Sequence, residues 1–201
     1  MSNAASHRHR IVAAQFIAAL SLLPSLASSN AATAMRACSD LSEADADTAC
    51  VLYTEPSSFN DHVLVVDSGA FRVMRFASAR ARDQSRIRPG HPDRLPMPYL
   101  RSAAVGLAVP RPLDRLLVIG LGGGAFPRFV AHRYPGVAID AVEIDPVVAR
   151  VARDYFGVVE NDRLRVHVAD AVDYVRRQRE PYDYILLDAY GAGDLPAALT
   201  S

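Results

Sequence analysis

The sequence predicts an α/β protein with a Rossmann-like, doubly wound parallel sheet, preceded by a small β-hairpin region near the N-terminus. Three observations support this fold class. From residue 115 onward, short apolar runs alternate with segments whose apolar residues recur at helical spacing. The apolar runs are continuous, which is typical of parallel strands that are covered on both faces. A cluster of glycines follows the first run, where a strand passes into a helix.

The composition is that of a globular protein. Of the 201 residues, 50% are apolar, and 22 basic side chains balance 22 acidic ones. The high apolar fraction excludes a wholly disordered chain, and the balanced charge gives no support for nucleic acid as a partner. All of the basic side chains are arginines, which excludes P-loop, Schiff-base and Ser-Lys chemistry, because each of these needs a lysine.

Residues 1–34 have the pattern of a signal peptide, which predicts an exported, periplasmic protein. Two arginines precede an apolar stretch at 11–27, and small residues then lead to the cleavage pattern Ala32-Thr33-Ala34. The apolar stretch is short for a membrane span, so no stable span is expected after cleavage. The alternative is a mis-called start codon and a cytoplasmic protein. Cleavage would leave 167 residues with a net charge near −2, enough for one domain.

The region 35–98 is predicted to contain a polar lead-in and a few short strands. Ser68-Gly69 is a turn signal that predicts a hairpin between the last two strand-like runs. The stretch 77–98 is basic and contains prolines, which favours a solvated loop over an anion-binding patch. The strand-like runs are 51–55, 62–67 and 71–76.

The cysteines and histidines do not indicate a metal site. Cys38 and Cys50 would form a local disulfide in an oxidising compartment and would remain ordinary thiols in the cytosol. The histidines lack the spacing of metal ligands, and His167, which alternates with two valines, is expected to face solvent. No metal is therefore predicted.

Residues 99–201 are predicted to form the nucleoside-binding domain, beginning with a helix over 99–108 that ends before Pro110. Strand and helix patterns then alternate, which predicts a parallel sheet with helices on both faces. The expected strands are 115–121, 137–144, 164–168 and 182–188, and the expected helices are 125–133, 146–156 and 171–179.

The clearest functional signal is the glycine cluster that contains Gly120, Gly122 and Gly124. It fits the dinucleotide fingerprint G-x-G-x-x-G/A and also the G-x-G-x-G of enzymes that bind a nucleoside sulfonium. Glycines permit positive φ and let backbone N–H groups at a helix N-terminus approach a ligand. The same glycines can also serve tight packing between strand and helix, so the cluster needs support from its context.

Acidic residues supply that context, because Glu143, Asp170 and Asp188 stand at the ends of three successive predicted strands. Ligands bind at the carboxyl ends of parallel strands in open α/β sheets, and a carboxylate in the position of Glu143 can accept the hydroxyl groups of a ribose. Asp145 is expected to cap the following helix, and a helix cap is the alternative for Asp170. The set predicts a nucleoside pocket.

With these motifs, residues 52–200 resemble the spermidine synthase-like aminopropyltransferases, which are relatives of the class I S-adenosylmethionine-dependent methyltransferases. The resemblance implies that Glu143 holds the ribose of decarboxylated S-adenosylmethionine or methylthioadenosine, Asp170 contacts the adenine amino group, and Asp188 accepts a proton. It also implies contacts with the substrates, one of which is a polyamine, at Gln84, Tyr99 and Tyr190. The matching segments are EPSSF at 55–59, QS at 84–85, Tyr99, LLVIGLGGGA at 116–125, VEIDP at 142–146, the strand end at Asp170, YDYILLDAY at 182–190 and LPxxLT at 195–200.

Three positions of the family pattern are changed in this sequence, and two of them lack an expected carboxylate. Gly123 stands where the family's loop has an aspartate for the aminopropyl end of the co-substrate, and Gly191 stands where a second aspartate after the fourth strand grips the polyamine. Leu100 also replaces a residue that is usually polar. The family's fold continues past the fourth strand, so we expect either a C-terminally truncated fragment or a shortened relative that is inactive or obligately paired, as in a homodimer.

Three functions therefore stay open at the level of the sequence. The first is aminopropyl transfer from decarboxylated S-adenosylmethionine, without a metal. The second is methyl transfer from S-adenosylmethionine in the same pocket. The third is an exported binding or interaction protein that keeps the fold and has lost the chemistry. An NAD-dependent dehydrogenase shares the glycine fingerprint, but the chain offers no obvious hydride-transfer site.

Overall fold

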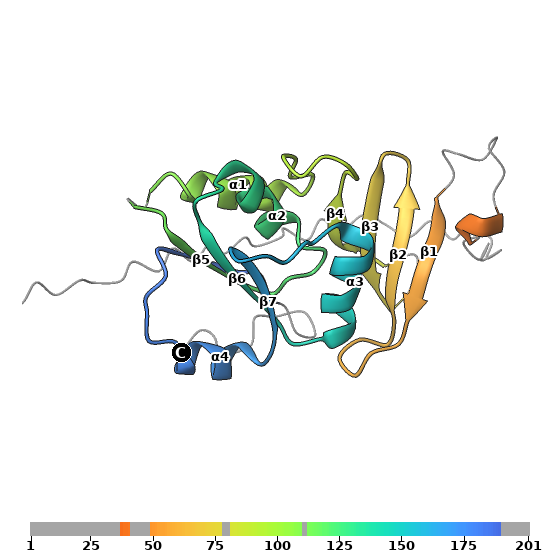
Figure 1. The fold of residues 1–201 in the computed structure, drawn as a ribbon. Coiled ribbons are helices and arrows are strands. Elements are labelled where there is room, and N and C mark those ends of the chain that lie inside the picture. The colour runs from red at the N-terminus through yellow and green to blue at the C-terminus, as the bar shows by residue number, and fades with distance from the viewer. Residues whose placement is uncertain (1–36, 41–48, 78–80, 110–111, 190–201) are drawn as a thin grey trace, which may run out of the picture.

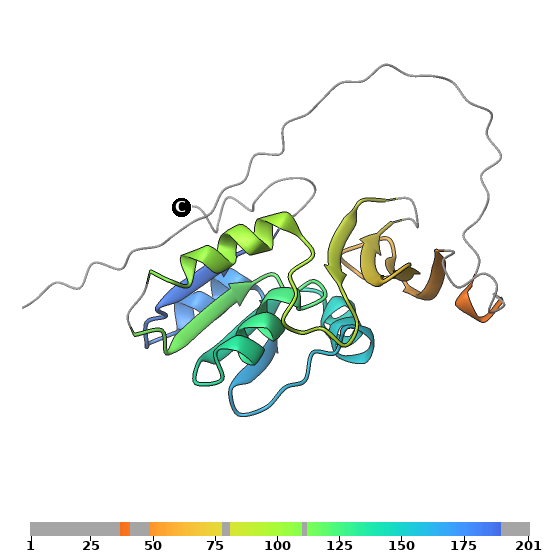
Figure 2. The same cartoon turned by 90° about the horizontal axis from the view of Figure 1, so that it is seen from above.

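Two four-stranded sheets make up the fold of the protein, for which we describe residues 37–40, 49–77, 81–109 and 112–189 of a computed structural model. The N-terminal sheet is antiparallel with the order β1-β2-β3-β4, and the C-terminal sheet is parallel with the order β7-β6-β5-β8. Figures 1 and 2 show the two sheets side by side with helix α3 between them. The predicted α/β class and its parallel sheet are confirmed.

The antiparallel sheet contains one strand that the sequence pattern does not predict. The stretch 77–98 was expected to be a solvated loop, but β4 lies within it and pairs with β3. Its sequence DQSRI has a single apolar residue, so it carries no strand pattern. Asp83 at its start forms an ion pair with Arg75 of β3, which ties the strand to its neighbour, and a second ion pair with Arg86 within β4. The strands are β1 (Cys50–Glu55), β2 (Val63–Ser68), β3 (Phe71–Phe76) and β4 (Asp83–Ile87).

The parallel sheet follows the predicted alternation of strands and helices. Its first strand, β5, lies between β6 and β8, so the strand order reverses beside β5. Ligands bind in open α/β sheets at such a reversal. The elements are α1 (Pro98–Gly106), β5 (Arg115–Ile119), α2 (Ala125–Arg133), β6 (Ala138–Glu143), α3 (Pro146–Phe156), β7 (Leu164–Val168), α4 (Ala171–Arg177) and β8 (Tyr184–Leu187).

The two faces of the parallel sheet are covered differently (Figure 1). Helices α1, α2 and α3 pack on one face, which we call the α1–α3 face, and the short helix α4 packs on the other, the α4 face. Side chains alternate between them along each strand, as β-geometry requires. On β5, Leu116 and Val118 join the large core of the α1–α3 face, whereas Leu117 and Ile119 join the smaller α4 cluster.

A disulfide joins the segment before β1 to the antiparallel sheet. Cys38 lies in a short 3-10 helix, Cys38–Asp40, and is bonded to Cys50 at the start of β1 with an S–S distance of 2.08 Å. The local disulfide expected for an oxidising compartment is therefore present. Among the helices of the described residues, we find none that is long and apolar enough to cross a membrane.

Candidate functional site

A cleft of about 670 Å³ lies at the carboxyl ends of the parallel strands, where the sequence predicts a ligand. Its volume is within the range of small-molecule sites, roughly 300–1,000 Å³. The wall opposite the strand ends comes from the β1–β2 loop, from β4 and from the start of α1. The predicted site residues that line the cleft are Gln84, Tyr99, Gly120, Gly122, Glu143, Asp170 and Asp188.

Glycines of the loop between β5 and α2 permit close packing as well as ligand approach. Gly120 has φ 89°, and a Cβ at this position would overlap the backbone carbonyl of Asp188. This glycine therefore lets the ends of β5 and β8 meet. Gly124 has φ 67° at the N-cap of α2, and a Cβ there would overlap the side chain of Val158. Gly124 is not among the residues that line the cleft, and its close approach to Val158 serves packing between loop and helix. Its predicted part in ligand binding stays a prediction.

Glu143 connects the end of β6 to the glycine loop. Its Oε2 accepts hydrogen bonds from the backbone N–H groups of Leu121, at 3.0 Å, and Gly122, at 3.4 Å. Its Oε1 accepts from the N–H of Asp145 at 3.1 Å. Burial raises the pKa of the Glu143 carboxyl, and the three N–H groups oppose that rise. The loop and the carboxylate thus hold one another at the cleft floor.

Asp188 stands directly after β8 and is held from both sides of the cleft. Its backbone N–H donates to the carbonyl oxygen of Ile119 at 2.8 Å, and its Oδ2 accepts from the Tyr99 hydroxyl at 2.8 Å. Burial raises the pKa of the Asp188 carboxyl to about 7, although the Tyr99 hydrogen bond lowers it. The negative charge of Glu143 adds to the rise. A half-buried carboxyl with a pKa near neutrality is suited to proton transfer.

Asp170 lines the cleft and also caps α4, so its position is compatible with both of the roles that the sequence left open. Its Oδ1 accepts from the N–H groups of Val172, at 2.7 Å, and Asp173, at 3.2 Å. Tyr190, the remaining predicted substrate contact, lies outside the described residues. Its role stays a prediction.

Asp145 has a larger part in the site than the helix cap that the sequence predicted. It caps α3 as expected, by accepting from Val147 N–H at 2.8 Å. Its Oδ2 also accepts from the Ser57 hydroxyl at 2.6 Å and from the Asn60 side-chain amide at 2.9 Å. These two residues lie in the β1–β2 loop, so the buried carboxylate fastens that loop over the cleft. Sequence spacing gives no signal for a bond between positions so far apart.

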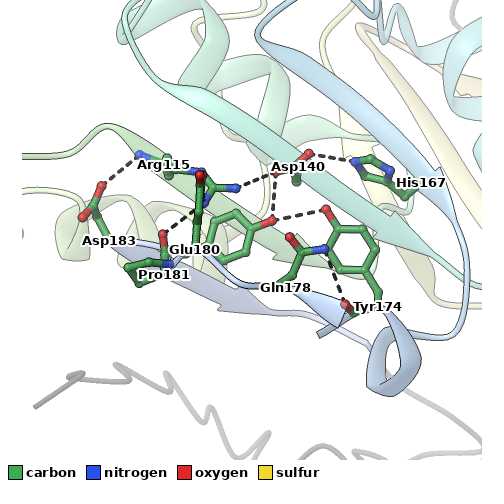
Figure 3. A network of polar contacts seen from close by, with 9 residues as sticks. Arg115, Asp140, His167, Tyr174, Gln178, Glu180, Pro181 and Asp183 are labelled. Atoms are coloured by element: carbon green, nitrogen blue, oxygen red, sulfur yellow. Dashed lines mark hydrogen bonds and ion pairs between the residues drawn. The ribbon is translucent and has the colours of Figure 1, made fainter. Parts of the chain in front are cut away.

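A second polar cluster lies on the α4 face (Figure 3). None of the residues labelled there lines the cleft. At its centre is Asp140 of β6, whose Oδ1 lies 2.7 Å from Nε2 of His167 and whose Oδ2 accepts from the Tyr182 hydroxyl at 2.9 Å. The expectation that His167 faces solvent is therefore wrong. Its strand position is turned toward α4, where the ring also lies 4.8 Å from the ring of Tyr174.

Comparison with known proteins places the chain beside two groups of enzymes. Residues 102–197 match the family described as spermine/spermidine synthase domain. A polyamine aminopropyltransferase of Vibrio vulnificus (strain CMCP6) is 34% identical over 168 residues, which are 81% of this chain and 56% of the relative. The eEF1A lysine and N-terminal methyltransferase of Homo sapiens is 47% identical over 79 residues, 36% of this chain and 11% of that protein. The chain thus spans about half the length of the aminopropyltransferase and a smaller share of the methyltransferase.

Solved structures show the same fold. A probable spermidine synthase from Corynebacterium glutamicum ATCC 13032 has a TM-score of 0.63 and 22% identity, covering 74% of this chain and 56% of its own. A spermidine synthase in complex with the transition state analogue AdoDATO has a TM-score of 0.54 and 18% identity, covering 75% of this chain and 50% of its own. At this identity the likeness shows the fold alone, and it agrees with the resemblance stated from the sequence motifs.

Proposed function

We propose that this chain, which carries a spermine/spermidine synthase domain over residues 102–197, belongs to an enzyme that transfers an alkyl group from an adenosyl–sulfonium co-substrate to an amine. The favoured donor is decarboxylated S-adenosylmethionine, and the favoured reaction is aminopropyl transfer to a polyamine. The observation that carries the proposal is the presence of Glu143 and Asp188 in one cleft, one suited to a ribose and the other to a proton.

The residues of the cleft fit a nucleoside. A carboxylate has about four acceptor positions, and backbone N–H groups occupy three of those of Glu143. The remaining position, on Oε1, is left for a ribose hydroxyl. Asp170 lies at the neighbouring strand end, where its carboxylate can accept from the adenine amino group that the resemblance implies. In this proposal Gln84 and Tyr99 on the opposite wall contact the rest of the substrates.

Asp188 supplies the proton acceptor that the reaction needs. The amine nitrogen attacks a carbon bonded to the sulfonium sulfur and forms the new C–N bond. The C–S bond breaks at the same time, and its electrons leave with the sulfur. The attacking nitrogen must give up one proton, and the Asp188 carboxylate takes it in this proposal. Its pKa of about 7 lets it be ionised near neutral pH and still accept a proton readily. The Tyr99 hydroxyl orients Oδ2 by donating to it.

The charges of the cleft favour a cationic ligand. Glu143 and Asp188 repel one another, and each is partly withdrawn from water. A positive sulfonium bound beside them would stabilise both carboxylates in their ionised form. Binding should therefore release protons from the protein at pH values near 7, because the pKa of Asp188 falls when the cation arrives.

Calorimetric titration of the full chain with methylthioadenosine and with S-adenosylmethionine tests the nucleoside site. Binding of either ligand is expected, and a Glu143→Gln variant should bind more weakly because one ribose acceptor is changed. If the folded wild-type chain binds neither ligand, the proposed function fails. The chain would then be better described as a binding or interaction protein that keeps the fold.

Methyl transfer from S-adenosylmethionine is the second candidate, and Gly123 favours it. A Cβ at this position would lie 2.6 Å from Cδ1 of Phe156 and 2.8 Å from Oγ of Ser85, so no acidic side chain fits without displacing them. The resemblance puts the carboxylate for the aminopropyl end at this place in the loop. Transfer of label from intact S-adenosylmethionine, compared with transfer from its decarboxylated form, separates the two candidates.

We also propose that the protein is exported. The Cys38–Cys50 disulfide supports this proposal, because structural disulfides persist in oxidising compartments and are rare in the cytosol. The predicted signal peptide at 1–34 lies outside the described residues. Mass spectrometry of the natively expressed protein tests the proposal. A chain that begins at residue 35 with oxidised cysteines is expected, and a full-length chain with two free thiols would contradict export.

A further inference from the structure

The polar cluster on the α4 face has a fixed direction of hydrogen bonding. Asp140 can only accept, so the Tyr182 hydroxyl donates its single proton to Oδ2 at 2.9 Å. The Tyr174 hydroxyl, 3.2 Å from that of Tyr182, must then be the donor of this pair. Burial raises the pKa of both phenols, which keeps them protonated and able to donate. The chain of donation therefore runs from Tyr174 through Tyr182 to Asp140.

The far end of this chain of hydrogen bonds is fixed firmly in the sheet. Asp140 lies on the inner strand β6, between β5 and β7, and only 16% of its side chain is exposed. Its carboxylate also faces His167 at 2.7 Å and the Arg115 guanidinium at 3.7 Å. The same guanidinium lies 4.6 Å above the Tyr182 ring, which holds the ring in place.

The Tyr174 end of this chain of hydrogen bonds lies on α4, a helix that makes few other contacts with the sheet. None of the seven residues of α4, all of which the structure describes, is fully buried. Ala171 and Tyr174 are the α4 residues that pack on the apolar cluster of this face. A helix of two turns is marginal by itself and depends on its tertiary contacts. The Tyr174 side chain is thus the main link between α4 and the sheet.

The start of α4 forms part of the cleft. Residues 169–172, which include the cap and first turn of the helix, line it together with the strand ends. Because Oδ1 of Asp170 is bonded to the first N–H groups of α4, the Asp170 carboxylate moves with the helix. Any shift of α4 is therefore a shift of the wall that faces a bound nucleoside.

We propose that Tyr174 and Tyr182, anchored on Asp140, are positioning residues that set the place of α4 and of the 169–172 wall, and thereby the recognition of the nucleobase. This inference rests on the proposed function for its ligand. It assigns a role in binding to a cluster that has no contact with the cleft itself, and the role acts through the geometry of one helix.

The test compares two Tyr→Phe variants of the full chain. Tyr174→Phe keeps the ring and removes the hydroxyl, so we expect the Kd for methylthioadenosine to rise about fivefold, the effect of one lost hydrogen bond. The preference for methylthioadenosine over methylthioinosine, which lacks the amino group, should fall by a similar factor. Amide hydrogen exchange of α4 should become faster, while that of α3 stays unchanged.

Tyr184→Phe is the matched control. The Tyr184 hydroxyl donates to the Ala103 carbonyl oxygen at 2.8 Å on the opposite face, so this variant also loses one hydrogen bond. It should lower stability without changing base preference or α4 exchange. If Tyr174→Phe leaves both the base preference and the hydrogen exchange of α4 unchanged, the inference is overturned. If the wild type binds no nucleoside, the proposed function fails, and α4 exchange alone then decides whether Tyr174 positions the helix.

Discussion

The two faces of the parallel sheet are closed by different kinds of interaction. On the α1–α3 face, three helices bury a large apolar core that includes Phe126 and Phe156, both almost inaccessible to solvent. On the α4 face, three buried strand residues suffice for a small apolar cluster, and a polar cluster around Asp140 supplies the rest. One face is closed by a large apolar core, and the other combines a smaller apolar cluster with directed hydrogen bonds.

This difference separates stability from adjustability. Apolar packing contributes much free energy and is not directional, whereas a hydrogen-bonded cluster depends on the position of every donor. The cleft lies at the end of the sheet where both faces meet, and it takes Tyr99 from the α1–α3 face and Asp170 from the α4 face. We therefore expect changes on the two faces to affect different properties.

The largest effect is expected at the junction of the faces, from Asp188→Asn. An amide cannot accept the proton of the attacking amine, so the rate of transfer should fall by a factor of roughly 10²–10⁴. Because the amide oxygen of the variant can still accept from the Tyr99 hydroxyl in the same geometry, nucleoside affinity should change little. Single-turnover assays and calorimetry measure the two quantities. An unchanged transfer rate would remove Asp188 from the proposed mechanism.

The next effect tests the comparison directly through stability. Phe156→Ala on the α1–α3 face empties a fully buried site and should lower the free energy of unfolding by roughly 3–5 kcal/mol. Tyr174→Ala on the α4 face removes a half-buried ring and should cost about 1–2 kcal/mol. Urea unfolding followed by circular dichroism gives both values. Equal losses would mean that the faces contribute alike.

A further effect is expected in the pH dependence of stability. Burial raises the folded pKa of Asp188 to about 7, so the folded state holds its proton more tightly than the unfolded state does. The contribution of this carboxyl to stability is therefore present at pH 4 and is lost as pH rises through 7. Wild type and Asp188→Asn should unfold at similar temperatures at pH 4, with the variant more stable at pH 8. The opposite order at pH 8 would show that the ionised carboxylate is well accommodated.

The smallest effect is expected at the rim of the α4 cluster. The side chain of Glu180 is 78% exposed and pairs with Arg115 at 3.0 Å. Because exposed ion pairs are screened by water, Glu180→Gln should change the free energy of unfolding by less than about 0.5 kcal/mol. The preference of this variant for methylthioadenosine over methylthioinosine should also match that of the wild type. A larger change in either would extend the functional part of the cluster to its surface.

Much of the parallel half could be predicted from local patterns. Helices α2 and α3 and strand β7 have the predicted bounds, because continuous apolar runs, the Asp145 cap and the glycine turn are local signals. Strand β4 could not be predicted, since it is stabilised by pairing with β3 and by the ion pairs of Asp83, not by its own composition. The hydrogen bonds of Ser57 and Asn60 to Asp145 could not be predicted either, because they join residues that are far apart in the chain.

The sequence by itself determined the fold class, the glycine loop and which carboxylates stand at the strand ends, because these follow from the order of residues along single elements. Only the tertiary structure decided that Tyr99 meets Asp188, that Asp145 holds the β1–β2 loop, and that His167 turns toward α4 and not to solvent. Each of these is a contact between elements distant in the chain. Burial, which raises the pKa of the Asp188 carboxyl, arises only when those elements pack together. The same packing brings the hydrogen-bond donors to Asp140.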